Sequence, residues 1–201
     1  MAVQHRKERE RLARRQLILN AAIRVFAQKG YHQATMDDVA EQAELGKGTL
    51  YYYFRSKDEI LLQLLEDNTR EFFAEILQSI SAEKRFIRMV RNVLFFYASY
   101  FSEHRLFFNI YFPFESGQIQ LKSPQFQEFR KTYREFRKPL EEVLFRQMER
   151  EGIQTISAEN FWRILGGVIM SINMEIHRET PIADIIRMID QFTAVLEHGL
   201  K

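Results

Sequence analysis

The segment TMDDVAEQAELGKGTLYYYFRSK, residues 35–57, has the pattern of two short helices joined by a tight turn. Thr35 is suited to cap the first helix, because its hydroxyl can accept a hydrogen bond from an amide of the first turn. Apolar residues then recur at helical spacing as far as Ala43, where residues 44–46 interrupt the pattern. A second helix is predicted over residues 47–53.

Two short helices with a turn of three or four residues suit a helix-turn-helix, whose second helix enters the major groove of DNA. Leu50 and Phe54 are four residues apart and are expected to pack inward, which leaves a donor-rich face outward. The other interpretation is a structural helical hairpin with a solvated face, and spacing alone leaves both open. If the segment binds DNA, the residues that we expect to face it are Thr35, Lys47, Gly48, Thr49, Tyr51, Tyr52 and Lys57.

The stretch GKGTLYYYFRSKDEIL, residues 46–61, resembles the DNA-binding signature of the TetR (tetracycline-repressor) family of bacterial transcription regulators. The similarity runs without a gap from about Arg15 to Leu62. It implies that Thr35 and Lys57 contact phosphates, and that the predicted outer face of residues 47–52 reads DNA. The turn departs from the family pattern, because it reads Ala-Glu-Leu-Gly where Ala-Gly-Val-Ser is common. It therefore lacks the cap hydroxyl and places a carboxylate near the DNA backbone.

Composition and charge narrow the class of protein. The absence of cysteine excludes disulfides and thiolate metal sites, and no apolar run is long enough to span a membrane. We therefore expect a cytoplasmic protein. Residues 1–57 carry 11 Lys and Arg against 6 Asp and Glu, whereas residues 58–201 carry 18 against 21. A basic head on a mildly acidic body fits a nucleic-acid contact at one end. The basic residues from His5 to Arg15 are either an arm that reaches DNA or a solvated helix start.

Helical periodicity over the whole chain predicts an all-α fold. Residues 1–57 form an N-terminal three-helix DNA-binding head with the helix-turn-helix, and its first residues, up to about Gln4, are expected to be irregular. A continuous helix from Lys57 to about Ile80 joins it to a larger body, residues 58–201, for effector binding and dimerisation. The remaining helices are predicted over residues 12–29, 82–102, 104–112, where Pro113 ends the helix, 124–151, 158–178 and 181–198.

Aromatic residues gather in one part of the body. Residues 86–112 contain seven Phe and three Tyr, which is more apolar surface than one helix seam needs. The excess indicates either the wall of an effector cavity or a Phe-rich core without one. We expect a hydrophobic effector, aromatic or with a long acyl chain. The residues predicted to line its pocket are Phe95, Phe96, Tyr97, Tyr100, Phe101, His104, Phe108, Tyr111 and Asn173.

The last two predicted helices each have a broad apolar face. Such helices from two chains can build a four-helix interface, or they can close the core of one chain. The family resemblance implies a homodimer whose two heads read a palindrome. The residues predicted at the dimer interface are Phe161, Leu165, Val168, Ile172, Ile185, Ile189 and Phe192.

Catalytic motifs are missing from the sequence, and its five histidines are dispersed. We therefore predict no enzyme activity, no metal and no cofactor. The expected function is a ligand-responsive, sequence-specific DNA-binding transcription regulator, a repressor that a hydrophobic small molecule releases from a palindromic operator. The alternative is a helical scaffold that binds lipid or protein and no DNA.

Overall fold

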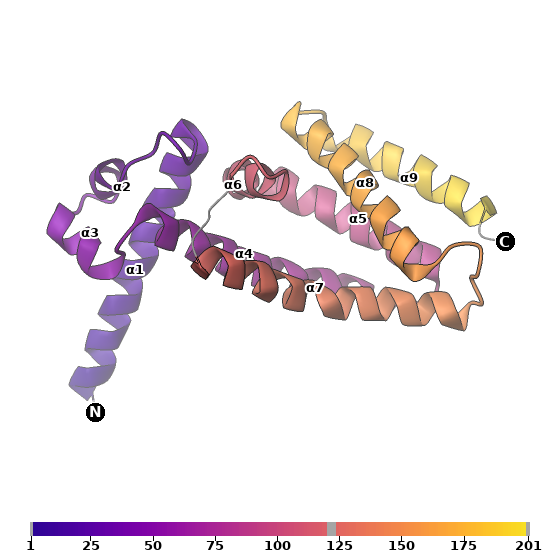
Figure 1. Ribbon diagram of the computed structural model, residues 1–201, viewed down its shortest axis with the longest axis horizontal. Helices are drawn as coiled ribbons and strands as arrows, with labels where there is room; N and C mark the ends of the chain where they lie inside the picture. The colour runs from indigo at the N-terminus through magenta and orange to yellow at the C-terminus, as the bar shows by residue number, and fades with distance from the viewer. Residues whose placement is uncertain (1, 120–123, 200–201) are drawn as a thin grey trace. The chain divides into compact units, whose positions relative to one another are not determined.

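The computed structural model describes residues 2–119 and 124–199, and its regular structure is entirely α-helical (Figure 1). The all-α prediction is confirmed. Within this part of the chain, no helix combines the length and hydropathy that a membrane crossing needs. The helices are α1 (Ala2–Lys29), α2 (Met36–Gln42), α3 (Lys47–Tyr53), α4 (Lys57–Ile80), α5 (Phe86–Glu103), α6 (Arg105–Glu115), α7 (Pro124–Arg150), α8 (Ala158–His177) and α9 (Ile182–Gly199).

The chain forms two compact units. The first takes in the residues up to Asn68 and from Leu106 to Arg130, and the second takes in residues 69–105 and 131–201. Helix α4 begins in the first unit and ends in the second. A functional boundary after Lys57, between DNA binding and effector binding, stays a prediction.

The core of the first unit is built on α1, which packs against α2, while α2 packs against α3. Ile18, Ala22 and Phe26 of α1 are buried, as are Leu50 and Phe54 at α3. A spacing of four residues puts these apolar side chains on one face of each helix.

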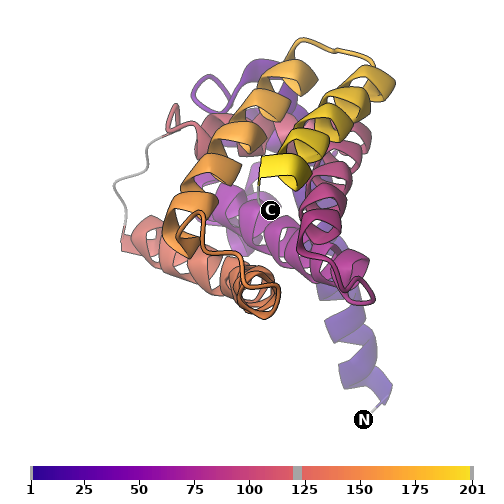
Figure 2. The same ribbon diagram turned by 90° about the vertical axis from the view of Figure 1, so that its right-hand side faces the viewer.

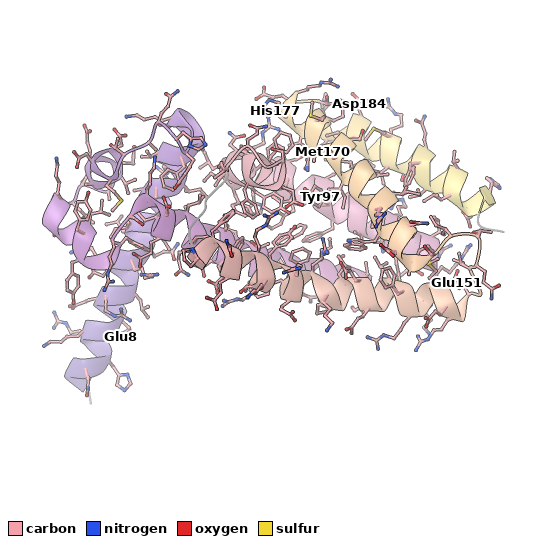
Figure 3. All side chains as sticks on the ribbon, viewed as in Figure 1. Glu8, Tyr97, Glu151, Met170, His177 and Asp184 are labelled. Carbon is pink, nitrogen blue, oxygen red and sulfur yellow. The ribbon has the colours of Figure 1, made fainter. Side chains whose placement is uncertain are left out.

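Helix α1 begins at Ala2, so the prediction of an irregular start was wrong. Arg6 pairs with Glu10 at 2.8 Å, and Arg11 pairs with Glu8 at 2.7 Å. Such pairs, three or four residues apart, each stabilise a helix by a few tenths of a kcal/mol. These ion pairs stabilise the N-terminal turns of α1, which have no apolar face to pack against the core. Glu8 marks this N-terminal part of α1 in Figure 3.

The second unit is organised around α5, which packs against both α8 and α9. Arg91 of α5 pairs with Asp190 of α9 at 2.7 Å, and Arg85 pairs with Glu197 at 2.6 Å. Figure 2 shows α8 and α9 side by side, and their residues are also in contact. The inner face of this pair is therefore covered by the chain's own α5.

Helix α6 does not end before Pro113, as the sequence suggested, but continues to Glu115. The proline has no amide hydrogen, so the last turn lacks the bond that residue 113 would otherwise donate to the carbonyl of Asn109. Two bonds close the helix, from the amide of Ser116 to the carbonyl of Phe112 at 2.9 Å and from the amide of Gly117 to Phe114 at 3.1 Å. Gly117 has a φ of 77°, which a glycine adopts without strain.

Candidate functional site

The start of α2 is fixed by a reciprocal cap. The amide of Asp38 donates to the Thr35 hydroxyl at 3.1 Å, and the amide of Thr35 donates to the Asp38 carboxylate at 2.9 Å. Lys29 lies 2.6 Å from the same carboxylate. The bonds from Lys29 and then Thr35 lower the pKa of Asp38 to about 2. This network holds the entry to the helix pair in one geometry.

The turn between α2 and α3 is a Schellman motif. The amide of Leu45 donates to the carbonyl of Ala40 at 2.9 Å, and the amide of Glu44 donates to Glu41 at 3.0 Å. Glu44 occupies the left-handed position of this motif, with a φ of 54°. Glycine is usual there because it has no Cβ. The unusual residue of the turn therefore stands at its most demanding backbone position.

The outer face of α3 is open. Leu50 and Phe54 are fully buried, whereas Tyr51 is 50% exposed and Tyr52 is 78% exposed. Lys47, Gly48 and Thr49 are exposed as well. The structure thus places five of the predicted DNA-facing residues on one polar surface of a short helix.

Lys47 is available to a phosphate at small cost. Its ammonium lies 2.6 Å from Asp37, but the lysine side chain is 68% exposed and the aspartate 57%. Such an exposed pair contributes little and is screened by salt. A DNA phosphate can replace the carboxylate.

Lys57 is bonded to the protein's own backbone, and its phosphate contact stays a prediction. Its ammonium donates to the carbonyls of Tyr31 at 2.9 Å, His32 at 3.0 Å and Ala34 at 3.0 Å. The same group lies 4.7 Å from the centre of the Tyr31 ring. An ammonium has three donor protons, so a phosphate contact would have to break one of these bonds. As placed here, Lys57 shapes the loop between α1 and α2.

Arg14 is a residue that the sequence did not single out. It lines an open hollow beside α3, and its side chain forms no ion pair with any described residue. The periodicity of α1 would have placed Arg14 outward, but only the packing of α1 beside α3 shows which surface it faces. The hollow is lined by Arg14, Leu45, Gly48, Thr49, Tyr52 and Tyr53.

Four of the predicted pocket residues meet around one ring that the sequence did not assign to the pocket, Phe72 of α4. Its centre lies between 5.1 and 5.8 Å from the ring centres of Phe96, Tyr97, Tyr100 and Phe101. Burial, and then the nearby charges of Glu71 and Glu75, raise the pKa of Tyr100 to about 12. These rings of α4 and α5 pack together as an apolar cluster, and their place in an effector pocket stays a prediction.

The other predicted pocket residues lie in several places. His104 is exposed and stacks on Tyr100 at 4.1 Å, and Phe95 is 39% exposed. Phe108 and Tyr111 are buried in α6, which belongs to the first unit. The Tyr97 hydroxyl donates to the side-chain oxygen of Asn173 at 2.8 Å, so these two residues meet as a buried polar pair.

The predicted dimer residues divide by exposure. Phe161, Leu165, Ile172, Ile185 and Ile189 are buried within the single chain, and Val168 and Phe192 are half-buried. The first five therefore serve the core of this chain. The surface of α8 and α9 instead presents other apolar side chains, namely Ile164, Met170, Met174, Ile182 and Val195.

Among the residues that the structure describes, no three His, Cys, Asp or Glu side chains cluster as a metal site would require.

Comparison with known proteins adds a family relationship. The model of the bacterial regulatory proteins of the tetR family matches residues 18–64. The chain is 36% identical over 63 residues to the fatty acid metabolism regulator protein of Bacillus subtilis (strain 168), covering 31% of this chain and 32% of that protein. The alignments span 23% to 51% of the length of the first curated relatives.

Solved structures resemble the chain over most of its length. A protein of Clostridium perfringens assigned to fatty acid metabolism regulation has a TM-score of 0.67 and 28% identity, covering 88% of this chain and 94% of that one. FadR from Bacillus subtilis in complex with stearoyl-CoA has a TM-score of 0.71 and 19% identity, covering 92% and 99%. At 19% identity, the similarity to FadR shows a shared fold only.

Proposed function

Since this chain belongs to the tetR family of bacterial regulatory proteins, we propose that it is a transcription regulator that binds operator DNA through α3 and responds to a hydrophobic small molecule. The observation that carries the proposal is the open outer face of α3, with its buried inner residues Leu50 and Phe54. A short helix anchored from one side only can enter a major groove. The role is regulatory and not catalytic.

The DNA contacts divide into two kinds. Lys47 and Arg14 supply cations for phosphates, which set affinity and salt dependence. Thr49, Tyr51 and Tyr52 present hydroxyls and ring edges that can read bases. Thr35 presents the first turn of α2, where amides and the helix dipole favour a phosphate. Lys57 acts indirectly, by holding the loop that leads into α2.

We expect two copies of the chain to act together. A dimer places two α3 helices on half-sites about one turn of DNA apart, which makes the operator a palindrome. The half-buried residues Val168 and Phe192 and the exposed apolar side chains of α8 and α9 are available for the interface.

The proposed effector is a long-chain acyl compound. The aromatic cluster around Phe72 offers apolar surface that suits an apolar chain. One curated relative and one solved structure carry names that concern fatty acid metabolism, and a solved structure of FadR has stearoyl-CoA bound. The proposed direction is repression that the ligand relieves, through a coupling of about 1–3 kcal/mol between the effector and DNA sites.

The test starts from a duplex that the full-length protein selects from a random-sequence pool. Fluorescence anisotropy should show that log K falls with log salt, by about 0.9 for each neutralised phosphate. Lys47→Ala should reduce that slope by about one unit, whereas Lys138→Ala, an exposed cation of the second unit, should leave it unchanged. Tyr51→Ala should weaken binding of the selected duplex more than binding of a scrambled one.

Two results would contradict the proposal. If no duplex is bound in a salt-dependent manner, the helical scaffold without DNA binding becomes the better interpretation. If DNA is bound but stearoyl-CoA neither raises the melting temperature nor releases the duplex, the acyl effector is excluded while the regulator stands.

A further inference from the structure

Asn173 of α8 is a polar side chain in an apolar setting. It is fully buried, and its side-chain oxygen accepts the hydrogen bond from Tyr97 of α5 at 2.8 Å. Its amide nitrogen is also buried and has no hydrogen-bond partner among the residues that the structure describes. Figure 3 labels Tyr97 on α5 and Met170 on α8, three residues before Asn173.

Such a donor is uncommon, because nearly all buried polar groups in proteins are paired. A buried amide whose N–H groups have no acceptor destabilises the folded chain. A leucine of similar size would avoid that penalty. The amide is therefore a candidate for a group that another molecule satisfies.

The surroundings indicate what that molecule offers. The ring of Tyr97 lies 5.6 Å from that of Phe72 and 4.7 Å from that of Phe101. Arg105, at the start of α6, reaches α8 and contacts the carbonyl of Ile176 at 2.8 Å and Glu179 at 3.0 Å. Burying a carboxylate costs far more free energy than burying a neutral carbonyl, so a neutral acceptor suits the amide better.

We propose that the Asn173 amide donates a hydrogen bond to the neutral carbonyl oxygen of an acyl thioester or ester, whose chain lies against the rings of Phe72, Tyr97 and Phe101. The inference rests on the proposed hydrophobic effector and adds a requirement for a carbonyl. Tyr97 is the positioning residue, because its hydroxyl holds the Asn173 oxygen and thereby orients the nitrogen.

A matched pair of ligands tests this. Stearoyl-CoA carries the thioester carbonyl, and S-octadecyl-CoA is the thioether that replaces it with a methylene. Calorimetric titration of the full-length protein should show about tenfold tighter binding of the thioester, which corresponds to about 1.4 kcal/mol. In Asn173→Leu, and in the double variant Tyr97→Phe with Asn173→Leu, the two ligands should bind equally.

Thr193→Val is the matched control. Thr193 is also a buried polar residue of the second unit, but its hydroxyl is satisfied by the carbonyl of Ile189 at 2.9 Å. This variant should keep the tenfold preference and melt at a lower temperature than the wild type. The ligand-free double variant should melt at or above the wild-type temperature, because it removes an unpaired group together with its partner.

Each contrary result has a distinct meaning. A preference that persists in Asn173→Leu, or one that is absent from the wild type, overturns the carbonyl contact and leaves the hydrophobic effector in place. A double variant that melts as low as Thr193→Val shows that water already satisfies the amide and also overturns the inference. Failure of both ligands to bind a wild-type protein that binds DNA overturns the inference together with the acyl effector.

Discussion

Replacing Glu44 by glycine tests whether the turn between α2 and α3 is strained. Glu44 has a φ of 54° at the left-handed position of the Schellman motif. A residue with a Cβ costs about 1–2 kcal/mol in that conformation. Glycine removes this cost, but its freedom in the unfolded chain costs about 0.5–1 kcal/mol. We expect the free energy of unfolding to rise by about 0.5–1 kcal/mol.

For a chain of this length, each kcal/mol moves the melting temperature by about 2–4 °C, so Glu44→Gly should melt about 1–4 °C higher. Glu44→Gln removes the charge and keeps the Cβ, so its melting temperature should not change. Both variants should bind the selected duplex more tightly than the wild type, because both remove a carboxylate beside the DNA-facing helix. Differential scanning calorimetry and fluorescence anisotropy measure the two effects separately.

Glu179 provides an internal control. It occupies the same position of a second Schellman motif, after α8, with a φ of 63°. Glu179→Gly should therefore raise the melting temperature by a similar amount without changing DNA affinity. Its exposed pair with Arg105 contributes little to stability. If Glu44→Gly melts no higher than Glu44→Gln, the turn is not strained and the reasoning is refuted.

Three further predictions concern the same head. Lys57→Met should lower the free energy of unfolding in urea by about 2–3 kcal/mol, because charge-assisted bonds to three carbonyls are lost. If the variant instead binds DNA more weakly at unchanged stability, that result would support a direct contact of Lys57 with a phosphate. Gly46→Ser should stabilise α3 by a few tenths of a kcal/mol in thermal unfolding, since Gly46 is a helix cap without a side-chain bond and has room for a Cβ; no gain would mean that the added hydroxyl does not cap. The pKa of Asp38, lowered to about 2, contributes stability that is present above the unfolded value of about 4 and is lost as the pH falls from about 4 to 2. Asp38→Asn should therefore be less stable than the wild type at neutral pH and should lose less stability between pH 4 and 2. If the two proteins lose the same stability over this range, Asp38 is not the group responsible.

The helix pair was predictable because its signals are local. A cap at Thr35, apolar spacing to Ala43 and the breaker residues of the turn lie within one short segment. The bounds of α3 and α4 matched the prediction, residues 47–53 and 57–80, for the same reason.

What the sequence left open depends on which surfaces meet. The charge of Lys57 suggested a phosphate, but its targets are backbone carbonyls that any sequence would supply. The apolar faces of α8 and α9 were compatible with either a partner chain or their own core, and only packing against α5 shows that Ile185 and Ile189 are buried within the chain. Phe72 looked like one more apolar residue of α4, because periodicity does not reveal which neighbours a ring will have.

The bonds of Lys57 to the loop after α1 also bear on how this loop can evolve. Two of the three acceptors belong to His32 and Ala34, and it is their backbone oxygens that are held. Mutation of the exposed His32 leaves the backbone oxygen of residue 32 in place, so substitutions at this position are tolerated as long as Lys57 is kept. Arginine is a poor replacement, since its flat fork of donors does not match three acceptors grouped around one point. Homologues are expected to vary at the loop and to keep the amine.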